Sequence, residues 1–175
     1  YNVGVGYDAG AAVTTGKENT LIGGLAGDAL TTGSNNVAVG YEALSTEDAH
    51  GNNVAIGNRA LKTLNAGATG LNTAVGDDAG LLMTTGLSNT LIGGAAGDAL
   101  TDADFNTAVG KDALSSDTLG SKSTAIGTGT LGAQNFTTAT DTFNTAVGYF
   151  AGIGITTAVN NTLIGAHAGD AITTG

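Results

Sequence analysis

Short runs of alternating small and β-branched residues, each closed by a glycine, recur along the whole chain. Residues 35–44 read NNVAVGYEAL and residues 52–61 read NNVAIGNRAL. In each phrase three residues alternate between two side-chain directions before the glycine. This period of two, carried by β-branched residues, predicts a short strand with two distinct faces. Because Gly and Thr recur every few residues, no apolar stripe at helical spacing survives, and helices are disfavoured.

The closing glycines set the length of the repeat. Successive ones lie 17 residues apart, except for steps of 19 after the fourth phrase and 21 after the eighth. They are Gly6, Gly23, Gly40, Gly57, Gly76, Gly93, Gly110, Gly127, Gly148 and Gly165. Ten phrases in an uninterrupted array predict one repeat domain, residues 1–175, with no linker.

A longer period is superimposed on the phrases. Four residues after each closing glycine the chain has Gly, Gly, Leu, Leu and then the same series again, and Leu21, Leu91 and Leu163 follow the same four-phrase period. The duplicated unit is therefore about seventy residues long. It occurs at 2–71 and 72–143, with a partial copy at 144–175.

Stacked phrases predict an all-β protein, a parallel β-solenoid of about ten 17-residue rungs. One phrase cannot bury its Val or Ile alone, whereas stacked phrases form a continuous thin core. One phrase per turn is favoured, and two phrases per turn of about 34 residues is the alternative. An Asn that recurs before most of the strands either forms a hydrogen-bonded ladder between rungs or serves the turns.

The alternating strands also predict self-association. If the Val and Ile column lies inside the coil, the Ala and Leu column faces outward; the reverse assignment puts Val or Ile outside. Either way a long apolar stripe is left on the surface, and such stripes rarely stay exposed to water. Burial against two further copies is the expected remedy.

Composition and charge exclude several classes of function. Asp and Glu number 15 against 5 Lys and Arg, giving a net charge of −10. The five basic residues are scattered, which argues against a nucleic-acid or anionic membrane surface. There is no Cys, so disulfides and thiolate metal sites are excluded, and no apolar run is long enough for a membrane-spanning helix. The chain begins within a phrase, and we expect it to be a segment of a longer protein.

The phrase N-[TV]-A-[VI]-G-x-x-A resembles the head repeats of trimeric autotransporter adhesins, the YadA-like family, and related repeats in phage tail-fibre-like proteins. The resemblance covers essentially all of the chain. It implies a left-handed β-roll, a homotrimer and a non-enzymatic, extracellular role in attachment at a cell or virion surface. The repeat here is longer than that of the family, and we expect the additional residues in the turns at the TTG segments.

We therefore expect a stiff fibre segment that displays loops to a host cell-surface or matrix receptor. A self-assembling filament subunit, stacked end to end, is the alternative, and an ice-binding solenoid is a further one. The aligned Thr residues favour ice binding, but they share a face with Val and Ile, which predicts burial. Receptor contact is expected at the two insertions, residues 62–68 and 134–141, with Phe105, Phe136 and Phe143 either presented to a partner or covering the edge of the coil.

Enzymatic and metal chemistry find little support in the residues. His50 and His167 occupy unlike positions of distant phrases and have no recurring nucleophile or carboxylate partner. Asp28, Asp98 and Asp170 recur only every fourth phrase, and Asp102 and Asp104 form a single D-x-D, whereas a Ca²⁺ ion needs several oxygens at one point. We expect no catalytic, cofactor or metal site.

Overall fold

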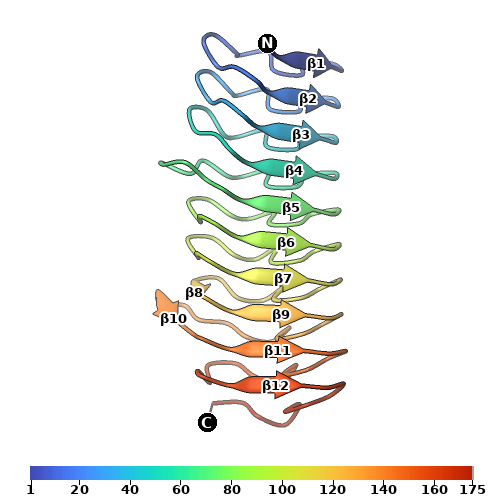
Figure 1. Cartoon of the computed structure of the whole chain (residues 1–175), viewed down its shortest axis with the longest axis vertical. Coiled ribbons are helices and arrows are strands. Elements are labelled where there is room, and N and C mark those ends of the chain that lie inside the picture. The colour runs from blue at the N-terminus through green and yellow to red at the C-terminus, as the bar shows by residue number, and fades with distance from the viewer. Residues whose placement is uncertain (175) are drawn as a thin grey trace.

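A computed structural model describes residues 1–174 as a straight stack of rungs (Figure 1). Ten strands form one parallel sheet, in the order β1-β2-β3-β4-β5-β6-β7-β9-β11-β12. Their bounds are β1 Val3–Val5, β2 Thr20–Ile22, β3 Val37–Val39, β4 Val54–Ile56, β5 Thr73–Val75, β6 Thr90–Ile92, β7 Thr107–Val109, β9 Thr124–Ile126, β11 Thr145–Val147 and β12 Thr162–Ile164. β8 (Gly120–Ser121) and β10 (Thr140–Asp141) pair in a separate two-stranded sheet. Within residues 1–174, no helix has the length and hydrophobicity needed to cross a bilayer.

The strand register confirms one phrase per turn. Each strand pairs in parallel with the strand of the next phrase, so that Thr73 lies beside Thr90 and Val75 beside Ile92. Where the spacing is longer, the register is kept: Ala125 pairs with Ala146 across the 21-residue step. The additional residues therefore leave the sheet undisturbed. At about 4.8 Å per rung, ten rungs reach about 48 Å along the axis.

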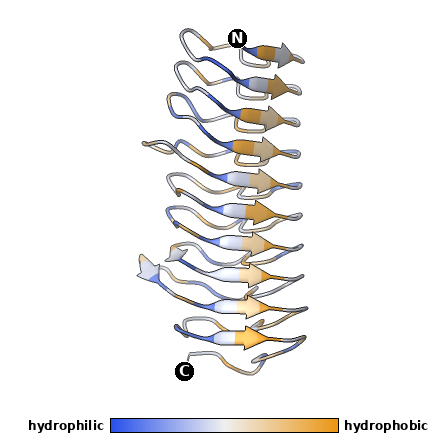
Figure 2. Cartoon of the chain, viewed as in Figure 1, coloured by the Kyte–Doolittle hydropathy of each residue, from blue (hydrophilic) through white to orange (hydrophobic). Residues whose placement is uncertain are grey.

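In the ten-stranded sheet from β2 onward, the middle residue of each strand points into the coil, and its neighbours point out. Ala38, Ala74 and Leu91 are fully or almost fully buried, whereas the flanking residues of β3, β5 and β6 are partly exposed. Of the two assignments left open by the sequence, the structure has Ala and Leu inside and Val and Ile outside. Figure 2, coloured by residue hydropathy, shows the strands of the sheet in one row along the stack, most of them turning white to orange toward their ends.

The seventy-residue period is a core-packing pattern. Leu21, the inward residue of β2, is placed so that a Cβ on Gly27 would lie 2.8 Å from its Cδ2 atom. In β3 the inward residue is Ala38, and Leu44, four residues after the closing glycine, fills the space instead. Leu44 does so with a left-handed φ of 54°, a conformation that costs a non-glycine residue about 1–2 kcal/mol. A large residue in one column is thus matched by a small residue in the other.

Candidate functional surface

The outer face of the ten-stranded sheet is a regular array of Thr, Val and Ile. Ile22, Ile56, Ile92 and Ile126 are each 38% exposed, and this common value indicates a flat row. Two positions earlier in these strands lie Thr20, Thr90 and Thr124, with Val54 in β4, and all four are partly exposed on the same face. The prediction that these Thr residues would be buried is therefore wrong, because the face they share with Val and Ile is the outer one.

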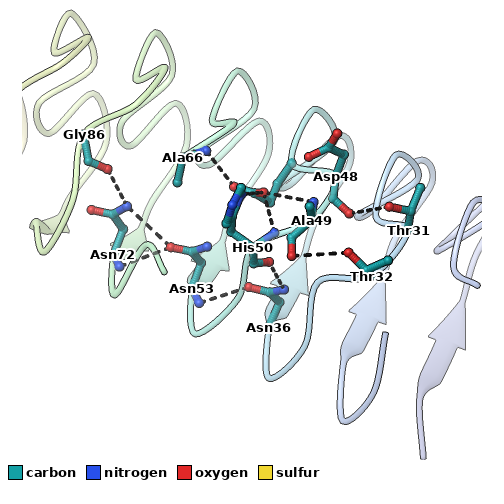
Figure 3. A network of polar contacts seen from close by, with 11 residues as sticks. Thr31, Thr32, Asn36, Asp48, Ala49, His50, Asn53, Ala66, Asn72 and Gly86 are labelled. Carbon is teal, nitrogen blue, oxygen red and sulfur yellow. Dashed lines mark hydrogen bonds and ion pairs between the residues drawn. The ribbon is translucent and has the colours of Figure 1, made fainter. Parts of the chain in front are cut away.

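Buried asparagines connect the rungs behind the strands (Figure 3). The Oδ1 atom of Asn36 accepts the backbone N–H of Asn53 at 3.0 Å, and that of Asn72 accepts the N–H of Asn89 at 2.9 Å. In most of these residues the Nδ2 group donates in the other direction, to a turn carbonyl: Asn72 Nδ2 donates to Gly86 O at 2.8 Å. The Nδ2 group of Asn53 is buried without a partner. The two proposed roles of Asn, ladder and turn, are thus filled by the two ends of one amide.

Two buried carboxylates hold the inserted loops. Glu47 is fully buried; its Oε1 accepts the backbone N–H groups of Ala49 and His50, and its Oε2 accepts that of Ala66 at 3.0 Å. Asp117, seventy residues later, is also fully buried, and its Oδ1 accepts the N–H of Phe136 at 2.9 Å. Both acids lie seven residues after a closing glycine, a position that holds Val, Leu, Met, Ile or Gln in the other phrases.

The second carboxylate belongs to a larger polar cluster. Asp117 Oδ2 accepts from Gln134 Nε2 at 2.6 Å, and Gln134 also donates to Ser123 Oγ and accepts from Asn144 Nδ2. Ser123 stands where other rungs have the ladder Asn, and its hydroxyl bonds that of Thr142 at 2.6 Å. This cluster carries the hydrogen-bond network across the 21-residue step, where the Asn ladder is interrupted.

The anchored loops lie on one side of the stack. Figure 1 shows the loop between β4 and β5, and the segment that includes β10, extending farther from the stack than the turns around them. Phe136 is only 7% exposed and covers the coil, whereas Phe105 and Phe143 are 58% and 53% exposed. Lys122 lies between those two along the stack, with its Nζ 5.4 Å from the centre of the Phe143 ring and paired with Asp141.

The histidines belong to separate local groups. His50 Nδ1 lies 3.2 Å from Glu47 Oε1, and these two residues with Asp48 are the one trio of His and acidic side chains close enough to share a metal ion within residues 1–174. The Glu47 oxygens are already occupied by backbone N–H donors, so the geometry is that of a loop anchor. His167 lies against the rings of Tyr149 and Phe150, with Asp170 3.9 Å away.

Asp28 and Asp98, two of the recurring aspartates, lie in the turns that follow β2 and β6, near other acidic residues. Burial raises the pKa of Asp98 above its ordinary value, and the negative charges of Asp112 and Asp78 raise it further. The pKa of Asp28 is raised for the same reasons, with Glu42 and Asp8 as the neighbours. One carboxylate oxygen of each, Oδ1, is buried without a hydrogen-bond partner. Their acidic oxygens do not converge into a ligand set of three within residues 1–174.

Fold and surface together define a tandem-repeat parallel β-solenoid with an apolar outer sheet face and two laterally projecting loops. Comparisons with protein-family models, with curated proteins and with solved structures found no match to this chain. The assignment to this structural class rests on the repeat and its geometry.

Proposed function

We propose that the chain is a stiff, non-enzymatic segment of an extracellular fibre, either of a cell-surface adhesin or of a virion. Three copies associate side by side through the outer sheet face, as a left-handed β-roll trimer. The loops anchored by Glu47 and Asp117 project sideways and carry the contact with a host cell-surface or matrix receptor. The resemblance of the repeated phrase to adhesin head repeats is one support for this proposal.

The outer sheet face is the observation that carries it. The face presents a Val or Ile and a Thr or Val from nearly every rung, along about 48 Å of axis. Contiguous apolar patches larger than a few hundred Å² on soluble proteins usually mark an interaction surface. Because the row is straight and repeats itself, a second copy in register meets it with a complementary surface.

Light scattering on the purified chain tests the association. We expect a particle of three times the 16.9 kDa chain mass. Ile56→Glu combined with Ile92→Glu should give monomers, because two buried charges per chain would have to lose water at the interface. Leu82→Glu is the matched control: Leu82 is 50% exposed but lies outside the sheet, so the trimer should persist. A monodisperse monomer of the unaltered chain would remove the proposal.

Two alternatives predict other outcomes in the same experiments. A filament subunit that stacks end to end would give particles that grow with concentration. The last rung of one copy would then pair, strand to parallel strand, with the first rung of the next copy. An ice-binding solenoid is supported by the regular outward row formed by Thr73, Thr90, Thr107, Thr124, Thr145 and Thr162. It would stay monomeric and show thermal hysteresis, which Thr107→Tyr should abolish by breaking the flat row.

A further inference from the structure

A cavity of about 400 Å³ opens on the turn that follows β9. Its floor consists of three small residues, Gly129, Gly132 and Ala133, and the two glycines have no side chain. One wall is polar and includes Asp112, from the turn after β7. The opposite wall is apolar and consists of Phe150 and Ile153, from the turn after β11. We call this cavity the β9 notch.

We call the duplicated seventy-residue unit the super-repeat. In the super-repeat before the β9 notch, the equivalent place is filled by basic side chains. Arg59 and Lys62, in the turn after β4, stand seventy residues before Gly129 and Gly132. Lys62 Nζ lies 2.6 Å from Glu42 Oε2, and Arg59 Nη2 lies 2.6 Å from Asp78 Oδ2. Glu42 corresponds to Asp112 by the same offset. In the first super-repeat, two cations therefore bridge the acids of the rungs on either side.

In the second super-repeat the acid remains and the cations are absent. Asp112 keeps the position of Glu42, with Ser115 and Ser116 beside it on the same wall. In place of Asp78 the other wall has Phe150, whose ring lies over Gly129: a Cβ at that glycine would be 2.2 Å from two ring carbons. A carboxylate on one side and an aromatic ring on the other suit a cationic group, which is attracted to both.

Lys111 is the nearest internal competitor. Its Nζ lies 2.6 Å from Asp112 Oδ2, but the two side chains are 71% and 44% exposed. An exposed pair between adjacent residues contributes little free energy. Lys111 is also not among the residues that line the cavity. An incoming cation can therefore take over the carboxylate at small cost.

We propose that the β9 notch binds the side chain of a single Arg or Lys residue of a partner protein. The alkyl chain lies against Phe150 and Ile153, and the charged group reaches Asp112 and the serine hydroxyls. The net charge of −10 raises the local concentration of such cationic groups. The proposal is independent of the fibre function, because it requires only the rungs of β7, β9 and β11.

A nuclear magnetic resonance titration with Nα-acetyl-L-argininamide, and separately with the lysine equivalent, tests the site. We expect saturable shifts concentrated at the amides of Gly129, Gly132 and Ala133, and none with the uncharged glutamine equivalent. Asp112→Asn should weaken binding about fivefold or more. Glu18→Gln removes the same charge from an exposed site outside the notch and should leave the affinity unchanged.

Filling the notch from within gives the second test. Gly132→Lys places a lysine at the position equivalent to Lys62. Its Cβ would lie 2.8 Å from Ile153 Cδ1, the end of a side chain that can rotate, and 3.0 Å from the carbonyl oxygen of Gly129. This variant should no longer bind the amide probes. The proposal is overturned if Glu18→Gln weakens binding as much as Asp112→Asn, if the shifts spread over all acidic turns, or if the glutamine probe binds equally. Should Gly132→Lys fail to fold, Asp112→Asn alone decides.

Discussion

Replacing Gly93 with alanine should disrupt the stack about as much as a large core truncation, or more. Gly93 closes β6 with a φ of 134°, and a Cβ built there lies 2.5 Å from the carbonyl oxygen of Gly110 and 2.6 Å from its carbon. The obstructing atoms are backbone of the next rung, so no side chain can move aside. The same contact recurs at each closing glycine from Gly6 to Gly148.

The magnitude follows from the movement needed to relieve the contact. Bringing the Cβ to an ordinary separation from the oxygen requires the rungs to part by about 0.8 Å, on a spacing of about 4.8 Å. This stretches the flanking hydrogen bonds, including Gly110 N–H to Ile92 O at 2.7 Å, each contributing about 1 kcal/mol. Overpacking adds about 1–3 kcal/mol and the positive φ about 1–2 kcal/mol. With two such hydrogen bonds lost, we expect a total loss of about 4–7 kcal/mol.

Two other glycines separate the steric effect from the backbone effect. Gly67 has a φ of 65° and Gly165 a φ of 124°, and neither would place a Cβ within 4 Å of another atom. Alanine should cost only about 1–2 kcal/mol at Gly67, and about 1–3 kcal/mol at Gly165, whose φ lies beyond the left-handed helical region. Urea unfolding followed by circular dichroism measures all three variants. If the losses in unfolding free energy caused by Gly93→Ala and Gly67→Ala differ by less than about 1 kcal/mol, the backbones of neighbouring rungs are not in close contact at Gly93.

Three further substitutions test the polar interior. Asn89→Ala should lower the free energy of unfolding by about 3 kcal/mol in urea titrations, because it leaves the buried N–H of Asn106 and the carbonyl of Ala103 without this partner. Asn161→Ala, in the partly exposed part of the ladder, should cost less than half as much. Glu47→Gln replaces one acceptor oxygen by an N–H₂ group, so hydrogen exchange at the Ala66 amide should accelerate about tenfold or more. Asp98→Asn should raise stability at pH 7. Because the pKa of Asp98 is raised in the folded state, the folded chain binds more protons just above pH 3.8, so the unaltered protein loses stability as pH rises through that pKa, and the variant should not.

The repeat spacing predicts most of the fold, because a rung is a local solution repeated at each phrase. The three-residue strands, the glycine at each corner and the continuous register all follow from the 17-residue step. The direction of the strand faces does not follow from alternation alone, which is equally compatible with Val39 or Ala38 inside. The distinguishing signal is volume: Leu21 precedes Gly27, whereas Ala38 precedes Leu44, and such compensation is expected only between residues in one core.

The loop anchors and the β9 notch are less visible in the sequence. Glu47 and Asp117 resemble ordinary surface acids until they are aligned with Leu64 and Met83 of the same column, which are fully buried. An acid at a core position in the rung before each insertion is the signal that identifies them. The notch arises from a difference between two copies of one unit. The sequence shows that Gly129 and Gly132 replace Arg59 and Lys62, but only the structure shows that this replacement leaves a cavity.

The contrast between the turns after β4 and β9 shows how such a repeat can vary in recognition while keeping its fold. Their interiors match: Ala55 and Ala125 are fully buried, and so are the Leu residues that follow each closing glycine by four positions. Their exteriors differ completely, with two cations in one and two glycines in the other. Because each rung is supported mainly by its neighbours, a change on the outside of one turn is not transmitted along the stack. New surface chemistry can therefore arise one rung at a time, provided the inward column and the asparagine ladder are kept.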